Sequence, residues 1–344
     1  MSNNPNSLAV QPERITNFMV GLEAIEGYQV YNLPDLSGLV NHKGFFSRPK
    51  VKLGSGLFID KESFARDSAG PAPDSKPDAF SFQVQPGHRF GREASHNQVF
   101  FGKLLVSGMY SDGMKAETQV AIKPTENRGA LLGELAMLQY MRALNIPTFE
   151  PRGFLATNVS KHDHLLTRFE KQVATMDTVD WRELNNGEKW GQIDFAVATL
   201  SLLHSHMLFH GDLEFKNVAF GETGDLIIVD PELTVSTAEI GEVALHANND
   251  AAAQRALETI TRNMSSDFTS VCNSIDQFIF HTMPPQKRPA AETDKFKAYS
   301  RYLFKPYKEA LQEQGSSYLT VLVKAYDAML RERKIRARET TPGA

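Results

Sequence analysis

The stretch FHGDLEFKNVAFGETGDLIIVDPE, from Phe209 to Glu232, sets Asp212, Asn217 and Asp230 at separations that could serve phosphate chemistry. Asn217 comes five residues after Asp212, and Asp230 comes 13 residues after Asn217. Carboxylate and amide oxygens are the hard ligands that Mg²⁺ accepts from proteins, usually beside phosphate and water oxygens. We therefore expect Asn217 and Asp230 to hold Mg²⁺, and Asp212 to orient a hydroxyl group and accept its proton in phosphoryl transfer.

This order and spacing resembles the protein kinase-like superfamily, whose catalytic loop reads H-R-D-x-x-x-x-N and whose metal-binding aspartate follows on a short hairpin. Upstream, VAIK ends at Lys123 and matches the lysine motif of the third strand in that superfamily. The resemblance implies that Lys123 binds the α and β phosphates of ATP. Glu134, on the next expected helix, is its implied ion-pair partner, with Glu117 and Glu126 as competitors.

The same resemblance implies roles for four further residues. The stretch HLLTRFEK falls where the superfamily has the hinge that binds adenine through its backbone, which implies contacts from Phe169 and Glu170. Asp267 is the implied first residue of a helix whose aspartate bonds back to the catalytic loop, although an aspartate after two serines is also a good helix cap. Lys216 is implied to offset charge on the transferred group.

Two departures from the superfamily pattern concern glycine. The glycine-rich lid over the phosphates is missing: if Gly102 is its third glycine, Asn97 and Val99 occupy the other two positions. The alternative is that PGHRFGR, residues 86–92, holds the phosphates. Gly211 replaces the arginine of H-R-D, so we expect no dependence on a phosphorylated activation segment.

The acceptor is the point on which the motifs disagree. VAIK and the Asp267 helix favour a protein kinase, whereas HGD and DPE resemble aminoglycoside and methylthioribose type small-molecule kinases. We predict transfer to serine or threonine of a protein, with a small-molecule kinase as the alternative. A pseudokinase that only binds partners is a further alternative, disfavoured because Lys123, Asp212, Asn217 and Asp230 are all present. Glu232 is a candidate to hold a metal-bound water.

Three histidines, His204, His206 and His210, invite a zinc interpretation with Asp212 as the fourth ligand. Residues two apart on a helix do not share a face, so His204 and His206 are expected to point to different sides. We expect His210 to pack inward and to hold the turn before Asp212. The metal-hydrolase interpretation is therefore the weaker one.

The elements that must position these residues change period along the chain. Strand patterns fill 80–124, a helix is predicted over Ala130–Leu144, a strand at HLLTRFE, and a helix over Gly191–His206. Linkers are predicted at Ala65–Phe80 and Thr282–Asp294. The predicted fold is α+β and bilobal: an N-terminal extension with linker (1–79), an antiparallel-sheet N-lobe with one helix (80–170), and a mainly helical C-lobe (171–344).

Composition limits the partners. The chain has 344 residues, more than the about 250 to 300 at which one core stops growing, so two lobes are expected. A net charge of −4 gives no reason to expect nucleic acid or an anionic membrane surface. The single cysteine, Cys272, forms no intramolecular disulfide, and no secretory signal or membrane-spanning run is visible. We expect a cytoplasmic protein.

Overall fold

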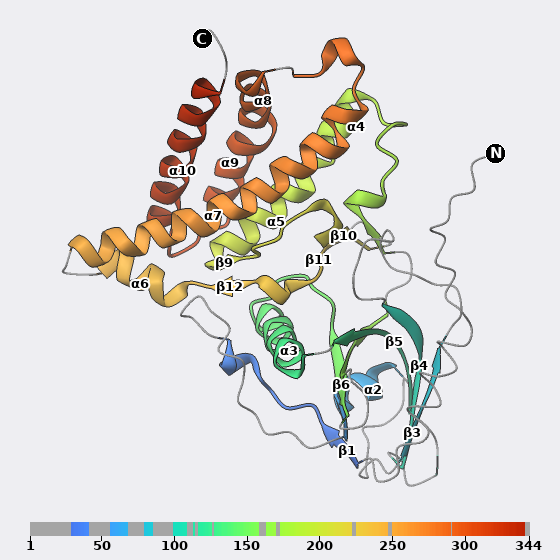
Figure 1. The fold of residues 1–344 in the computed structure, drawn as a ribbon. Coiled ribbons are helices and arrows are strands. Elements are labelled where there is room, and N and C mark those ends of the chain that lie inside the picture. Colours follow the sequence, from blue (N-terminus) through green and yellow to red (C-terminus); the bar gives the residue numbers. More distant parts are fainter. Residues whose placement is uncertain are drawn as a thin grey trace. The chain divides into compact units, whose positions relative to one another are not determined.

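The computed structural model describes residues 29–40, 56–67, 79–84, 99–108, 113, 116–125, 127–157, 163–169, 173–221, 225–246, 250–289 and 291–340. The chain divides into two compact units. Unit 1 contains Met1–Gly38, Arg48–Gln139 and Phe149–Glu170, and unit 2 contains Leu39–Ser47, Tyr140–Thr148 and Lys171–Ala344. The predicted α+β class is confirmed, with a curled sheet and a helical C-terminal region (Figure 1).

Unit 1 is built on a seven-stranded sheet in the order β1, β2, β6, β7, β5, β4, β3. The pair β1–β2 is parallel, and the other neighbouring pairs are antiparallel. The strands are β1 (Gln29–Asn32), β2 (Gly56–Ile59), β3 (Ala79–Val84), β4 (Phe100–Ser107), β5 (Ala116–Thr125), β6 (Pro151–Ala156) and β7 (Asp163–Arg168). Helix α3 (Arg128–Ala143) follows β5, and the boundary between the units falls within it. The structure therefore contains the strands predicted within 80–124, the helix predicted over Ala130–Leu144, and the strand predicted at HLLTRFE.

Alternation along β5 determines which side chains face the core. Val120 and Ile122 are buried in a cluster with Leu104 of β4. Successive residues of a strand point to opposite faces, so Lys123 lies on the other face of the sheet. The VAIK motif thus points Val120 and Ile122 into the core, and Ala121 and Lys123 to the opposite face of the sheet.

The segment predicted as an N-terminal extension contributes to this core. Strand β2 pairs with β6, and both Ile59 and Phe64, a residue of helix α2 (Lys61–Asp67), are fully buried. The prediction of a linker from Ala65 is wrong at its start, because α2 continues to Asp67. The one helix predicted for 80–170 is α3, and α2 lies before that range, in the segment where the sequence predicts only short strand-like pieces.

A buried arginine on β6 fixes α2 in place. Arg152 is 1% exposed, and its Nη2 lies 2.9 Å from Oδ1 of Asp67, the last residue of α2. Glu150 lies 3.4 Å from Nη1 of the same guanidinium, and the Thr118 hydroxyl on β5 also bonds to Asp67. Burial lowers the pKa of Arg152, and the two carboxylates oppose that shift. A buried cation needs such partners, so α2 is part of the sheet's support.

Unit 2 is mainly helical (Figure 1). Its helices are α4 (Asn186–Gly191), α5 (Ile193–Ser205), α6 (Ala238–His246), α7 (Asp250–Phe278), α8 (Glu292–Tyr299), α9 (Lys305–Glu313) and α10 (Leu319–Glu339), with a π-helical turn at Ser300–Phe304. Strands β8 (Ala174–Thr175), β10 (Val218–Phe220) and β11 (Leu226–Ile228) form one antiparallel sheet, and β9 (Leu208–Phe209) pairs with β12 (Val235–Ser236). Single 3-10 turns span Ser37–Leu39, Met176–Thr178, Phe215–Asn217, Pro231–Leu233, Phe280–Thr282 and Pro285–Lys287. The predicted helix over Gly191–His206 contains α5. The predicted second linker, Thr282–Asp294, contains the 3-10 turn at Pro285–Lys287 and is wrong at its end, because α8 begins at Glu292.

Helix α7 is the central element of unit 2. Its buried residues Ile260, Met264, Phe268, Val271 and Ile275 recur every three or four positions, as a helix with one apolar face requires. The ring of Phe268 packs edge-on against those of Tyr307 and Phe304, with centroids 4.8 and 5.4 Å away. This packing fixes the orientation of the helix that carries Asp267. Among the helices that the structure describes, none has the length and apolar character needed to cross a membrane.

Candidate functional site

The loop after β9 is held from α7 by Asp267. The backbone N–H groups of His210 and Gly211 donate to its carboxylate over 2.9 and 2.7 Å. The His210 ring is fully buried, and its Nε2 lies 3.0 Å from the carbonyl oxygen of Val229, at the end of the hairpin. The loop before Asp212 is therefore fixed on both sides, and the inward packing predicted for His210 is present.

Asp267 occupies the middle of α7, so the prediction that it begins a helix, and the alternative that it is a cap, are both wrong. The predicted bond back to the loop is present. Asp267 is fully buried, and a buried carboxylate is costly unless donors surround it. Its third donor is His204 Nε2 at 3.1 Å, and Nδ1 of the same ring lies 2.9 Å from the Tyr307 hydroxyl.

The sequence interpretation missed the chain of contacts through His204 and Tyr307. Burial holds the pKa of the Tyr307 phenol well above its usual range, so the hydroxyl keeps its proton, whereas the Asp267 carboxylate at Nε2 can only accept. The imidazole then carries its proton on Nε2, facing Asp267. The available signal was a histidine at the end of an apolar helix, which the sequence alone does not pair with a distant tyrosine.

Asp212 and Asn217 are directly connected. The Asn217 side chain is buried; its Nδ2 donates to the Asp212 carbonyl oxygen over 2.7 Å and lies 3.3 Å from Asp212 Oδ2. The N–H of Phe215, between them, donates to the hydroxyl of Ser274 on α7 over 3.1 Å. The Asp212 carboxylate itself is about one-third exposed, at 34%. The loop thus presents the Asp212 carboxylate to solvent beside a buried amide.

Lys216 lies between two carboxylates of the loop. Its Nζ is 3.2 Å from Asp212 Oδ2 and 3.0 Å from Glu214 Oε2. Partial burial lowers the pKa of Lys216, but the hydrogen bonds and charges of Glu214 and Asp212 outweigh it and leave that pKa above its ordinary value. The ammonium is therefore charged at neutral pH and close to the candidate catalytic carboxylate.

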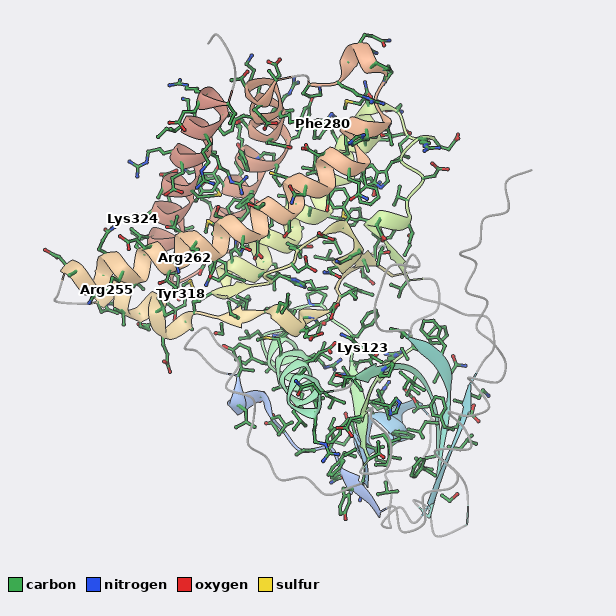
Figure 2. All side chains as sticks on the ribbon, in the orientation of Figure 1. Lys123, Arg255, Arg262, Phe280, Tyr318 and Lys324 are labelled. Carbon is green, nitrogen blue, oxygen red and sulfur yellow. The ribbon has the colours of Figure 1, made fainter. Side chains whose placement is uncertain are left out.

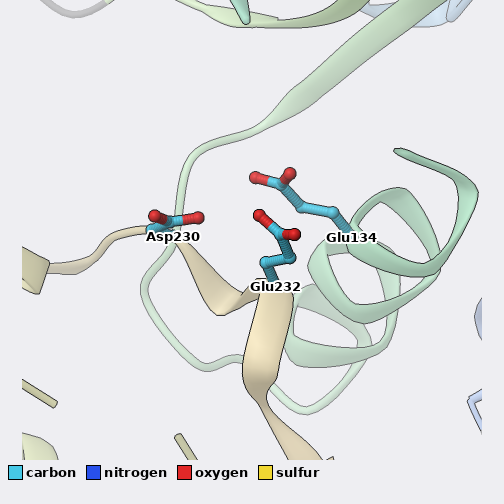
Figure 3. A group of neighbouring side chains, drawn as sticks. All are labelled: Glu134, Asp230 and Glu232. Atoms are coloured by element: carbon cyan, nitrogen blue, oxygen red, sulfur yellow. The ribbon is translucent and has the colours of Figure 1, made fainter. Parts of the chain in front are cut away.

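Asp230 follows the hairpin in an unusual backbone conformation. Its φ of 55° and ψ of 58° are left-handed, a region that few residues other than glycine adopt and that aspartate tolerates better than most. The preceding N–H, of Val229, donates to the Asn217 carbonyl oxygen over 3.0 Å, which ties Asp230 to the loop. Figure 3 shows Asp230 and Glu232 projecting from the same short segment, and their nearest carboxylate oxygens lie within 4.8 Å.

In unit 1, Lys123 and Glu134 form the ion pair that the resemblance implied. The Lys123 Nζ lies 3.1 and 3.0 Å from the two carboxylate oxygens of Glu134. Both side chains are mostly buried, at 17% and 9% exposed. Of the competitors, Glu117 is 2.6 Å from Lys103 on the solvated face, and Glu126 lies outside the described residues.

The sheet face that carries Lys123 also carries an aromatic pair. Phe101 lies opposite Ala121 in the register of β4 and β5, and its ring centroid is 4.7 Å from that of Phe169. The Phe169 N–H donates to the Gln119 carbonyl oxygen over 3.2 Å, so this donor is already used within the sheet. Glu170 lies outside the described residues.

Gly102 lies within β4, paired with Val84 on one side and Val120 on the other. It is a strand residue on the core-facing side, and the structure does not place it in a turn. Asn97 and residues 86–92 lie outside the described residues.

The zinc interpretation gains no support. Within the residues that the structure describes, no cluster of metal-binding side chains includes His204, His206 or His210. Burial lowers the pKa of His206, and the other two rings are used by Asp267 and Val229. Comparison with known proteins adds no assignment: no family model matches the chain, and no curated protein matches it.

Proposed function

We propose that the protein is a Mg²⁺-dependent phosphotransferase that moves the γ-phosphate of ATP to a hydroxyl group. The observation that carries the proposal is the rigid loop from His210 to Asn217, in which Asn217 bonds to Asp212 and its backbone bonds to the residue before Asp230. Phosphoryl transfer requires positioning and charge stabilisation more than covalent chemistry from the protein. A loop whose oxygen-bearing side chains are fixed in advance meets that requirement.

The donor set fits Mg²⁺. The Nδ2 atom of Asn217 is engaged by Asp212, which leaves the amide oxygen as the atom for a cation, and Asp230 supplies a carboxylate. Magnesium contributes charge neutralisation at the phosphates when it is bound. Asp212 orients the acceptor hydroxyl and accepts its proton, and Lys216 offsets charge on the transferred group. In unit 1, Lys123 binds the phosphates and Glu134 holds it in place.

A small-molecule acceptor is the second candidate, and one observation favours it over a protein serine or threonine. Only residues 231–237 separate Asp230 from α6, and they are held against β9 and Met207, just before the loop. Strand β12 pairs with β9, and the Thr237 N–H donates to the Met207 carbonyl oxygen over 2.8 Å. An extended polypeptide acceptor needs a surface to lie along. This segment presents Leu233, 58% exposed, as its main protruding side chain.

The experiment is transfer of label from γ-labelled ATP with Mg²⁺, offered the chain itself, a mixed protein extract, and a pool of aminoglycosides and small metabolites. Wild type is compared with Asp212→Ala and Asp230→Asn. The matched control is Asp194→Asn, an exposed aspartate in the first turn of α5. We expect label transfer by wild type and the control, and its loss in both site variants.

The fraction that carries the label decides the acceptor. Label on protein supports the serine or threonine candidate, and label in the small-molecule fraction supports the second. Absence of transfer by wild type in every fraction, with ATP still bound, contradicts the proposal and points to a pseudokinase. Transfer that survives Asp230→Asn unchanged contradicts the metal assignment.

A further inference from the structure

Helices α7 and α10 enclose a groove away from the candidate site. It has a volume of about 680 Å³ and runs along both helices. On α7 its walls include Glu258, Arg262 and several hydroxyl side chains, and on α10 they are formed by Ala328, Glu332 and Arg336. The α10 residues are four apart, so they form one stripe along the helix. Within unit 2 this stripe faces open space rather than packed side chains.

An exposed apolar side chain stands beside the groove. Ile335 is 54% exposed, one of four large apolar residues with such exposure among those described. At 100° per residue it lies roughly 60° around α10 from Glu332, on the side away from Arg336. The same face therefore carries both a recess and a protruding isoleucine.

The charges of this face are of both signs on both helices. Glu258 and Arg262 are one turn apart on α7, and Glu332 and Arg336 are one turn apart on α10. Arg262 is an exposed residue of α7 (labelled in Figure 2), and neither it nor Glu332 has an ion-pair partner among the described residues. A face of balanced, unpaired charges suits a copy of itself better than a strongly acidic or basic partner.

We propose that the α7–α10 groove is the interface of a two-fold symmetric dimer of this chain. A two-fold axis brings the same patch of each copy together, so a patch must be self-complementary to pair in this way. Here Ile335 of each copy enters the groove of the other, and Arg262 of each copy meets Glu332 of the other. The dimer is independent of the proposed phosphotransfer, because no residue of the candidate site lines the groove.

The test is the mass of the full-length protein by light scattering after gel filtration and by sedimentation velocity, over a hundredfold range of concentration. We expect wild type to dimerise and Ile335→Asp to raise the dissociation constant by at least about tenfold, because a charge would then enter the groove. Val243→Asp on α6 is the matched control: Val243 is 43% exposed but outside the groove, so its dimer should persist.

A charge exchange tests the register. Arg262→Glu alone should weaken the dimer, because two carboxylates then face each other, and Arg262→Glu combined with Glu332→Arg should restore it. Both positions are exposed, so the fold should survive, and circular dichroism melting confirms this for each variant. The proposal is overturned by a wild-type protein that is monomeric at every concentration, or by an Ile335→Asp dimer as tight as wild type.

Discussion

Gly211 shows how one residue permits the candidate catalytic loop to form. Its φ is 82°, in the left-handed region, and a Cβ at this position would lie 3.0 Å from the Leu233 carbonyl oxygen. The sequence alone shows only that Gly211 stands where the H-R-D motif has arginine. The structure gives a physical reason for glycine: any side chain here is strained by the backbone and crowded by the segment after Asp230.

We predict that Gly211→Ala destabilises the protein by more than the about 1–2 kcal/mol that the left-handed conformation alone costs an alanine. Gly315→Ala is the matched control, since Gly315 also has a positive φ, 67°, but a Cβ there meets nothing within 4 Å. Urea unfolding of both variants measures the difference. Equal losses in the two variants would show that the contact with Leu233 has no cost.

Asp267 is the second residue on which the loop depends. Asp267→Asn exchanges one carboxylate oxygen for an NH₂ group that faces the donors on His204 and the loop backbone. We predict a loss of about 3 kcal/mol or more in the free energy of unfolding, because buried donors lose their acceptor. Asp276→Asn on the same helix, 34% exposed, should cost clearly less in the same urea titration.

At the scale of elements, the ion pair between β5 and α3 has a testable consequence. Under the proposed function, Glu134→Gln should raise the KM for ATP about tenfold, equivalent to about 1.4 kcal/mol, because Lys123 loses the charge that holds it. The control is Glu117→Gln on β5, the strand that carries Lys123. This change breaks an exposed ion pair with Lys103 and should leave the KM for ATP unchanged. Nucleotide titration by calorimetry separates lost binding from lost turnover, and equal KM values for the two variants would refute the role of Glu134.

Helix α2 makes a prediction about the segment before the sheet. Asp67→Asn leaves the buried guanidinium of Arg152 with one fewer charge partner, and we expect a loss of about 3 kcal/mol in stability. Glu62→Gln, an exposed change on the same helix, should be close to neutral in a thermal melt. A melting temperature unchanged by Asp67→Asn would mean that α2 does not support the core.

The elements divide into those that local sequence specifies and those that depend on distant pairing. Strands β4 and β5 and helices α3 and α5 follow from their own periodicity, and so does the face on which Lys123 lies. The pairing of β2 with β6 joins residues about a hundred positions apart, and no local pattern shows it. Asp267 was misplaced for a similar reason: two preceding serines look like a helix start, but the apolar period continues unbroken from Ile260.

At the scale of the whole molecule, only part of the candidate site can be predicted from the sequence. The order of Lys123, Asp212, Asn217 and Asp230 is visible in the sequence, and so is the ion-pair partner of Lys123 as one of three candidates. The His204–Asp267–Tyr307 contacts are not, because they join α5, α7 and α9 through the core of unit 2. Sequence motifs therefore indicate the reactive residues, while the buried groups that position them require the fold.

Buried ionisable groups in the core of unit 2 also make the stability of the protein depend on pH in the alkaline range. Burial is the largest cause that raises the pKa of the Cys272 thiol to about 12, with Asp276 adding to the shift and Arg333 opposing it. Burial likewise raises the pKa values of Tyr299, Tyr307 and Tyr326 above their ordinary value of 10.0. In each case the folded state holds a proton that the unfolded chain releases at lower pH.

The sign follows from proton linkage. These groups contribute stability that is fully present below their unfolded pKa values, 9.0 for cysteine and 10.0 for tyrosine, and that is lost as the pH rises further. We predict that the urea midpoint falls between about pH 9 and about pH 12, and that Cys272→Ala makes the fall smaller and delays its onset. A thiol reagent at about pH 8 should label Cys272 only after unfolding, because the thiolate is scarce and the side chain is buried. Rapid labelling of the native protein, or a midpoint that does not fall over this range, would show that the core of unit 2 is open to solvent.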